Sequence, residues 1–234
     1  IETLIGRGSK QLTMDRVALD VISEYGAEDS DVTLKLKNIL WSKVMDMGLE
    51  KLYREIEEPL IDILADIELT GVRIDTEQLA DYATVLNAEM SSLESRIREI
   101  AETPDLNVNS SRQLGIVLFE KLRIDPKPKR TKTKQYSTDE EYLVSLADRH
   151  PVVEMILEYR GLKKLLSTYI EALPQLINHV TGRIHTSFNQ AVPSTGRLSS
   201  KHPNLQTIPI RTEQGRQIRN TFTPSDDDHL LLSA

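Results

Sequence analysis

A chain of 234 residues with 39% hydrophobic and 28% charged residues can form one or two domains with buried cores, and this composition is ordinary for a globular protein. The lack of cysteine excludes disulfides and cysteine-ligated metals, and no apolar run approaches the ~18 residues that span a bilayer. The net charge of −7 argues weakly against a nucleic-acid partner, although a binding face is local and total charge measures it poorly.

Both ends of the chain indicate a piece of a larger protein. The chain begins at Ile1 rather than at methionine, and it stops after HLLLSA, an apolar run typical of a buried strand. Proteins rarely end inside a core strand, so we expect more chain on either side.

The first part of the chain predicts helices. Residues 13–47 contain few helix breakers, and EIEEPLIDILADIELTG then carries apolar residues at helical spacing. These residues are Ile56, Leu60, Ile63, Leu64 and Ile67. Gly71 predicts the end of this helix, because glycine tolerates the left-handed conformation of a C-cap.

A long helix is predicted over residues 76–102. Asp75 can cap its start, with Gln78 three residues later. Its apolar residues follow alternating steps of three and four, namely Leu79, Tyr82, Leu86, Met90, Leu93, Ile97 and Ile100. One narrow apolar stripe needs a partner helix, so the pattern predicts a long-helix hairpin.

Shorter helices and then strands follow. NVNSSRQLGIVLFEKL predicts a helix capped by Asn109, Ser110 or Ser111, and Thr138 with Glu141 forms a capping box for the next. Pro151 suits the first turn of a helix that runs through LEYRGLKKLLSTYIEALPQLI. TGRIHTSFNQ predicts a β-hairpin or sheet edge, TPSDDD a turn and HLLLSA a strand. The predicted fold class is therefore α+β and predominantly helical.

The segment STGRLSSKHPNLQTIPIRTEQGRQIR is basic within an acidic chain and shows no clean periodicity. Its bases could neutralise phosphates, and its amides and hydroxyls could donate to phosphates or to minor-groove base edges. The bases are Arg197, Lys201, Arg211, Arg216 and Arg219; the amides and hydroxyls are Ser199, Ser200, Asn204 and Gln206. The alternative is a solvated basic loop.

Two further basic patches carry the same pair of alternatives. DPKPKRTKTKQYS, with its prolines, predicts an exposed loop that could follow a phosphate backbone or only aid solubility. Its bases are Lys127, Lys129, Arg130, Lys132 and Lys134. In YRGLKK, Arg160 and Lys164 share one helix face, which is either a DNA contact or an ordinary exposed face.

YGAED places Tyr25 and Asp29 on one face of a predicted helix. A carboxylate and a phenol so placed could hold a metal and orient a water for phosphodiester hydrolysis. Such pairs are common by chance, and the preceding residues supply no convincing acidic motif.

TGRLSSKHPNLQTIPIR resembles the signature that precedes the first catalytic motif of family A DNA polymerases, the bacterial DNA polymerase I type. Other segments are similar to the family in the right order. YGAEDSDVTL resembles the third motif of the 3′–5′ proofreading exonuclease, and EIEEPLIDILADIELTGVRID resembles the join between exonuclease and polymerase. NSSRQLGIVLFEKL and LEYRGLKKLLSTY resemble the thumb and the helix that follows it.

The resemblance implies a right hand of palm, fingers and thumb behind an exonuclease domain. Mapped onto this chain, residues 1–50 would be the last part of the exonuclease, 51–178 the linker and thumb, and 179–234 the start of the palm. The long-helix hairpin would be the stalk of the thumb. The basic loop would lie near its tip and grip duplex DNA through the backbone.

The resemblance also implies roles for single residues. Arg197 matches the arginine that contacts the minor groove at the primer terminus, and Asn204 and Gln206 match residues near the terminal pairs and template. Arg211 matches an arginine near the phosphates of the incoming nucleotide. The remaining matches are Arg160 and Lys164 (duplex contacts), Asn107 and Ser110 (thumb contacts to the backbone), and Tyr25 and Asp29 (exonuclease tyrosine and metal-binding aspartate).

The chain also departs from the family pattern. Thr207 stands where the family commonly has asparagine, and the chain stops where the polymerase aspartate should follow LLLSA. The fingers, the later palm and the upstream exonuclease carboxylates are missing too. We therefore expect these 234 residues to bind primer–template DNA weakly and to synthesise nothing.

For the intact protein the resemblance implies template-directed nucleotidyl transfer in DNA replication and repair. It would use Mg²⁺, deoxynucleoside triphosphates and primer–template DNA, with possible proofreading. We expect a monomer in the cytoplasm, associated with the nucleoid and not with a membrane. The alternatives are a non-catalytic DNA-binding or helical interaction module, or a related helicase–polymerase or phage polymerase.

Overall fold

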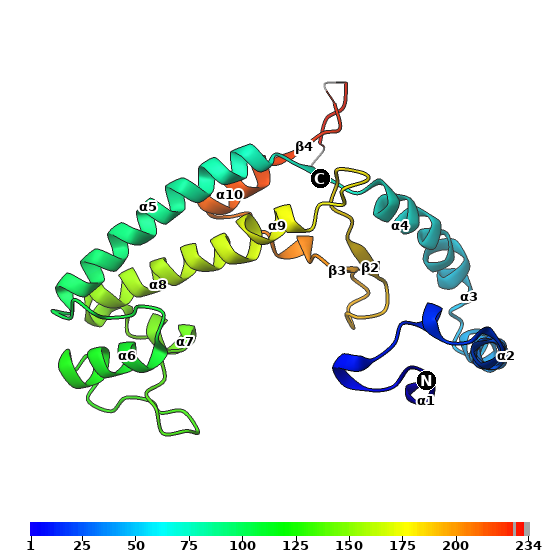
Figure 1. Cartoon of the computed structure of the whole chain (residues 1–234), viewed down its shortest axis with the longest axis horizontal. Helices are drawn as coiled ribbons and strands as arrows, with labels where there is room; N and C mark the ends of the chain where they lie inside the picture. Colours follow the sequence, from blue (N-terminus) through cyan, green and yellow to red (C-terminus); the bar gives the residue numbers. More distant parts are fainter. Residues whose placement is uncertain (227, 232–234) are drawn as a thin grey trace. The chain divides into compact units, whose positions relative to one another are not determined.

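The computed structural model describes residues 1–226 and 228–231, and Figure 1 traces the chain. The chain divides into two compact units, Ile1–Ala65 and Asp66–Ala234. The described elements are mostly helices, and the strands form two small antiparallel sheets of two strands each. The predicted fold class, α+β and predominantly helical, is confirmed.

The first unit contains one long helix and several short elements. The long helix α2 (Leu19–Asp46) confirms the helix predicted over residues 13–47, and none of its residues is buried. The short elements are α1 (Glu2–Ile5), η1 (Gly8–Lys10), η2 (Met14–Arg16), α3 (Glu50–Leu52) and the π-helical turn η3 (Tyr53–Glu57). Trp41 packs edge-to-face against Tyr53, with 5.3 Å between ring centroids.

Helix α4 (Glu58–Thr70) crosses the boundary between the units and ends at Gly71, as predicted. Gly71 has a φ of +63°, which favours glycine. A Cβ there would also lie 2.7 Å from both Nδ1 of His185 and the carbonyl oxygen of Ile184. Glycine is therefore required here both by the backbone conformation and by the space.

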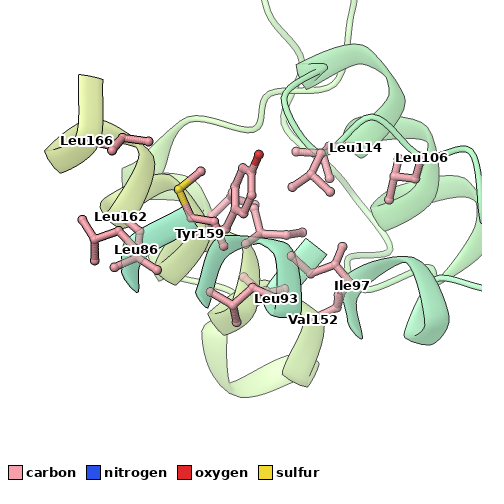
Figure 2. Packing of buried hydrophobic residues seen from close by; sticks show 14 of the residues in the cluster. Leu86, Leu93, Ile97, Leu106, Leu114, Val152, Tyr159, Leu162 and Leu166 are labelled. Carbon is pink, nitrogen blue, oxygen red and sulfur yellow. The ribbon is translucent and has the colours of Figure 1, made fainter. Parts of the chain in front are cut away.

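The core of the second unit is formed chiefly by two long helices. Helix α5 (Thr76–Ile100) begins at Asp75, whose side chain accepts hydrogen bonds from the backbone N–H groups of Glu77 and Gln78. Its partner is α8 (Pro151–Leu165), which begins at the predicted proline. Figure 2 shows their buried side chains together, with Leu86, Leu93 and Ile97 of α5 beside Val152, Tyr159 and Leu162 of α8. The predicted pairing of the long helix is thereby confirmed.

The segment between these helices folds into short elements at the far end of the pair (Figure 1). They are α6 (Ser111–Ile116), the π-helical turn η4 (Val117–Lys121), α7 (Glu140–Val144) and η5 (Ala147–Arg149). Ser110, one of three predicted candidates, caps α6. The predicted capping box at Thr138 is wrong, because Asp139 caps α7. Thr138 is buried, and its hydroxyl accepts a hydrogen bond from Arg160.

After α8 the chain passes through helical turns into the small sheets. The elements are η6 (Leu166–Ile170), α9 (Ala172–Gln175), β2 (Ser187–Asn189), β3 (Ser199–Lys201), η7 (Leu205–Thr207), α10 (Glu213–Asn220) and β4 (Phe222–Thr223). Strand β2 pairs with β3, which confirms the predicted β structure in this region, and β1 (Arg73–Ile74) pairs with β4.

Two features near the end of the chain differ from the sequence predictions. Helix α10 replaces the irregular segment that was expected, because the hydroxyl of Thr212 caps it and Ile218 anchors it in the core. No strand forms over residues 229–231, and the rest of the predicted strand, 232–234, lies outside the described residues. Across residues 1–226 and 228–231, no helix is long and apolar enough to cross a membrane.

Candidate nucleic-acid interface

The segment TGRLSSKHPNLQTIPIR, residues 195–211, which we call the signature segment, is folded tightly around Ser200. This serine is only 2% exposed, and its hydroxyl donates to Oδ1 of Asn204 over 3.2 Å. The same hydroxyl oxygen accepts from the N–H of Leu205 over 3.1 Å. The buried hydroxyl of Thr186 holds the adjoining turn, because it contacts the carbonyl oxygens of Lys201 and Pro203 at 3.1 and 2.7 Å. The sequence indicated the polar side chains but not this ordered turn.

The two amide residues of the segment face the protein backbone. Oε1 of Gln206 accepts from the N–H of Ser200, and its Nε2 donates to the carbonyl oxygen of Leu198, each over 3.0 Å. Asn204 begins η7, and its Oδ1 accepts from the N–H of Gln206 over 3.0 Å. Both side chains are partly exposed to solvent, so donors and lone pairs remain beyond these internal bonds.

Arg197 and Arg211 are placed differently from the amides. Both residues are exposed. Within residues 1–226 and 228–231, neither guanidinium forms a hydrogen bond or an ion pair. Two unpaired guanidinium groups, one on each side of the ordered turn, are suited to bind phosphate or base edges.

The signature segment is fastened to the helix α8–η6 through Tyr169. The phenol donates to the backbone carbonyl of Thr207, and its oxygen lies 3.1 Å from the hydroxyl of the same residue. Beside this contact is an apolar groove of about 530 Å³. It is lined by Glu158, Gly161, Leu162, Lys164, Leu165, Thr168, Tyr169, Thr207, Pro209, Thr212 and Gln214. The exposed Lys164 lines this groove together with Thr207 and Pro209, so it lies beside the signature segment.

Of the basic residues on α8, some bond to other parts of the protein and one faces solvent. Arg160 donates to the carbonyl oxygen and hydroxyl of Thr138, and burial lowers the pKa of its guanidinium. Nζ of Lys163 donates to Oδ1 of Asn109 over 2.6 Å. Lys164 has no such partner among the described residues and faces solvent. Of the two candidate DNA contacts on this helix, Lys164 is therefore more available to bind a ligand than Arg160.

Asn107 and Ser110 lie in one turn before α6. Oδ1 of Asn107 accepts from the N–H of Asn109 over 2.9 Å, and Oγ of Ser110 accepts from the N–H of Gln113 over 3.3 Å. Asn109 donates to the hydroxyl of Tyr159 over 3.0 Å, which fastens the turn to α8. The turn therefore presents an exposed amide and a hydroxyl from a fixed backbone.

The predicted basic loop is exposed, as expected, and is closed by backbone pairing between Arg130 and Tyr136. We call residues 127–136 the basic hairpin. The guanidinium of Arg130 lies 4.3 Å from the centre of the Tyr136 ring, and Nζ of Lys129 lies 5.0 Å from that of Tyr142. The lysines at 127, 132 and 134 are exposed. A fixed hairpin thus carries several cations on its surface.

Tyr142 and Asp125 hold the base of the basic hairpin. The phenol of Tyr142 donates to Oδ2 of Asp125 over 2.6 Å and accepts from the N–H of Lys129 over 3.0 Å. Hydrogen bonds from Tyr142 and from the N–H of Lys127 lower the pKa of Asp125, and nearby Arg149 acts in the same direction. Burial, with the bond to Asp125, raises the pKa of Tyr142. Nothing in the sequence marked this pair.

Tyr25 and Asp29 lie together on α2, as their spacing predicts. The carboxylate of Asp29 raises the pKa of the Tyr25 phenol. Across the described residues, however, no group of three or more His, Asp or Glu side chains is close enough to hold a metal ion. One exposed carboxylate with a phenol does not make a divalent-metal site. The described residues therefore do not fit bound Mg²⁺.

Comparison with known proteins decides the family. The model of DNA polymerase family A matches residues 76–234. This chain belongs to DNA polymerase family A. The matched range includes the helix pair α5–α8, the basic hairpin and the signature segment.

Curated relatives match all or nearly all of the chain. It is 44% identical to DNA polymerase I of Geobacillus stearothermophilus over 233 residues, which is 100% of this chain and 26% of the relative. It is 46% identical to DNA polymerase I of Chloroflexus aurantiacus over 226 residues, or 95% of this chain and 24% of the relative. The chain thus spans about a quarter of the length of these relatives.

A solved structure matches the fold. The POL domain of Pol1 from M. smegmatis, in complex with DNA primer-template and dNTP, aligns with a TM-score of 0.70 and 35% sequence identity. The alignment covers 81% of this chain and 33% of that chain. The arrangement of helices and small sheets is therefore that of a polymerase domain.

Proposed function

We propose that this chain contributes the primer–template grip of a DNA polymerase of the bacterial DNA polymerase I type. Its family membership carries the proposal, together with the exposed Arg197 in the TGRLSSKHPNLQTIPIR signature. The structural relative in complex with DNA primer-template and dNTP supports DNA as the partner. On this proposal the linker and thumb extend over residues 51–178 and the palm begins at 179.

Arg197 is the proposed contact to the minor groove at the primer terminus. The minor-groove acceptors are nearly common to all correct base pairs, so a donor there tests pair shape without preferring a base. Asn204 and Gln206 lie on the same turn, and on this proposal that turn is near the terminal pairs and the template. Arg211 is the proposed contact to the phosphates of the incoming nucleotide.

The remaining proposed contacts hold the duplex by its backbone. Lys164 lies beside the signature segment, and Arg160 shares its helix. Asn107 and Ser110 present polar groups from the turn before α6. The basic hairpin adds the exposed cations Lys127, Lys129, Arg130, Lys132 and Lys134. Contacts of this kind give affinity that is independent of sequence and sensitive to salt.

The activity of the whole protein is also a proposal, since the chain covers about a quarter of its relatives. The full-length gene product would extend a primer by template-directed nucleotidyl transfer from deoxynucleoside triphosphates in replication and repair, and would require Mg²⁺. It would act as a monomer on DNA in the cytoplasm. Tyr25 and Asp29 would form one corner of a proofreading site.

The direct test measures binding and synthesis separately. The 234-residue chain is titrated against a fluorescent primer–template and against a single strand of equal length. We expect weak, salt-sensitive binding that favours the primer–template, and no extension by the chain alone. The full-length gene product should extend the primer when Mg²⁺ and nucleotides are added. Binding without extension by the full-length product would favour a non-catalytic DNA-binding module instead.

A further inference from the structure

We propose that Gln206 is a positioning residue for Arg197. Its side-chain amide holds the open edge of β3 and the residue before it, Leu198, and so fixes the direction of the backbone that carries Arg197 into that strand. We call the two hydrogen bonds from the Gln206 amide to the backbone the clamp. The clamp is a property of this fold, whereas the group that Arg197 contacts rests on the proposed function. The proposal assigns Gln206 an indirect role instead of direct recognition of the template.

The amide of Gln206 bonds to the backbone at both of its ends. It accepts from the N–H of Ser200 and donates to the carbonyl of Leu198, each over 3.0 Å. Backbone groups two residues apart point to the same edge of a strand. Only β2 pairs with β3 among the described strands, so one edge of β3 has no strand partner. The amide supplies there the two hydrogen bonds that a residue of a neighbouring parallel strand would make.

The clamp is itself held in place. Oδ1 of Asn204 accepts both from the N–H of Gln206 and from the hydroxyl of Ser200. The hydroxyl of Ser200 also accepts from the N–H of Leu205, and Thr207 is bound by Tyr169 of the helical body. Gln206 therefore connects the strand edge to a turn that is anchored at its far side.

Arg197 depends on this clamp because it has few restraints of its own. Arg197 directly precedes Leu198 and is exposed. Among the described residues, no side chain or backbone group forms a hydrogen bond or ion pair with its guanidinium. The carbonyl of the next residue, Leu198, is held by Gln206. A side chain that acts on a reacting terminus loses effect when its geometry is loosened, even where affinity persists.

The first experiment tests the clamp without DNA. Amide hydrogen exchange is measured on the 234-residue chain and on the Gln206→Ala variant. We expect exchange at Ser200 to accelerate by about tenfold or more, because its N–H loses its partner. Exchange at Leu162, in the core, should not change. Gln217→Ala removes a matched amide from α10 and should leave Ser200 unchanged. Unchanged protection of Ser200 in Gln206→Ala would overturn the clamp.

The second experiment tests coupling to Arg197 in the full-length gene product. Primer-extension rate and primer–template Kd are compared for Gln206→Ala, Arg197→Ala and the double variant. We expect Gln206→Ala to slow extension by about tenfold with Kd changed less than about twofold, and to add less than about twofold in the Arg197→Ala background. An equal additional loss in that background would mean that Gln206 acts independently, as a direct DNA contact.

A second variant separates positioning from misfolding. Gln206→Glu keeps the acceptor for Ser200 but replaces the donor to Leu198, so it should slow extension with exchange at Leu162 unchanged. Extension at the wild-type rate would contradict the proposal. If the wild-type product extends no primer at all, the proposed function fails, and the exchange experiment still decides whether Gln206 clamps β3.

Discussion

Arg160 and Thr138, 22 residues apart in sequence, are joined by the guanidinium of Arg160, which donates to both the backbone carbonyl and the hydroxyl of Thr138. The contact ties α8 to the segment that leads from the basic hairpin into α7. Arg160 was predicted from resemblance to touch duplex DNA. In this structure Arg160 binds Thr138, so a contact to DNA would have to be made by the same guanidinium that holds this bond.

The first prediction follows from this contact. Arg160→Ala leaves the buried Thr138 without its donor, and hydrogen bonds to charged groups contribute about 1.5–3 kcal/mol each, net of the competing bonds to water. Because Arg160 is only half-buried, we expect a loss of about 1–2 kcal/mol in the free energy of unfolding of the chain. Lys164→Ala, one helical turn later and exposed, is the control and should leave stability unchanged. Urea denaturation measures both; equal stability of the two variants would contradict the role of Arg160.

Two helical glycines give the second prediction. A Cβ on Gly115 of α6 would lie 2.8 Å from Cβ of Tyr136, whereas a Cβ on Gly161 of α8 meets nothing within 4 Å. Gly115→Ala should destabilise the chain by about 1–3 kcal/mol by forcing the basic hairpin away. Gly161→Ala should stabilise it by about 0.5–1 kcal/mol through helix propensity. Thermal denaturation gives the sign of each change, and a stabilising Gly115→Ala would show that Tyr136 does not pack there.

The third prediction concerns pH. The pKa of Asp125 is lowered from its ordinary value of 3.8, chiefly by the hydrogen bond from Tyr142. A carboxyl with a lowered folded pKa contributes stability above its unfolded pKa and loses that contribution as pH falls through the folded pKa. The basic hairpin should therefore loosen below pH 3.8 and not above it. The amide signal of Lys127 in an NMR titration should report a midpoint below 3.8, and the signal should not titrate in Asp125→Asn. A midpoint at or above 3.8 would contradict the contact.

Local signals in the sequence were sufficient for the long elements. Asp75 and the apolar stripe from Leu79 to Ile97 predicted α5, since a cap and a helical period both act within a few residues. Pro151 predicted the start of α8, and Gly71 the end of α4, for the same reason. The apolar stripe of α5 was enough to predict that a partner helix covers it, and that partner is α8.

Contacts between distant residues set the features that were missed. Asp139 replaces Thr138 as the cap of α7 because Arg160 binds Thr138 from another helix. Helix α10 has little apolar content beyond Ile218, and it forms where that side chain enters the core. The sequence also could not show that Gln206 bonds to the backbone at Leu198 and Ser200, because an amide in a turn carries no pattern that names its partner.

The fourth prediction concerns the salt dependence of DNA binding. Each phosphate contact that is lost lowers the slope of log K against log salt by about 0.9 on duplex DNA. Replacing Lys127, Lys132 and Lys134 by alanine in the chain should lower the slope by up to about 2.7, with little effect on folding because all three are exposed. The matched control replaces three exposed lysines of the first unit, Lys10, Lys37 and Lys43. A larger slope change in the control would place the DNA elsewhere.

The most direct test of the proposed grip is the Arg197→Ala substitution in the full-length gene product. Single-turnover extension and primer–template affinity are measured side by side, with Arg96→Ala, an exposed arginine of α5, as the control. We predict that Arg197→Ala slows extension by about tenfold or more while Kd changes by less than about threefold, because the lost contact acts at the primer terminus. A large loss of affinity with an unchanged extension rate would contradict the account.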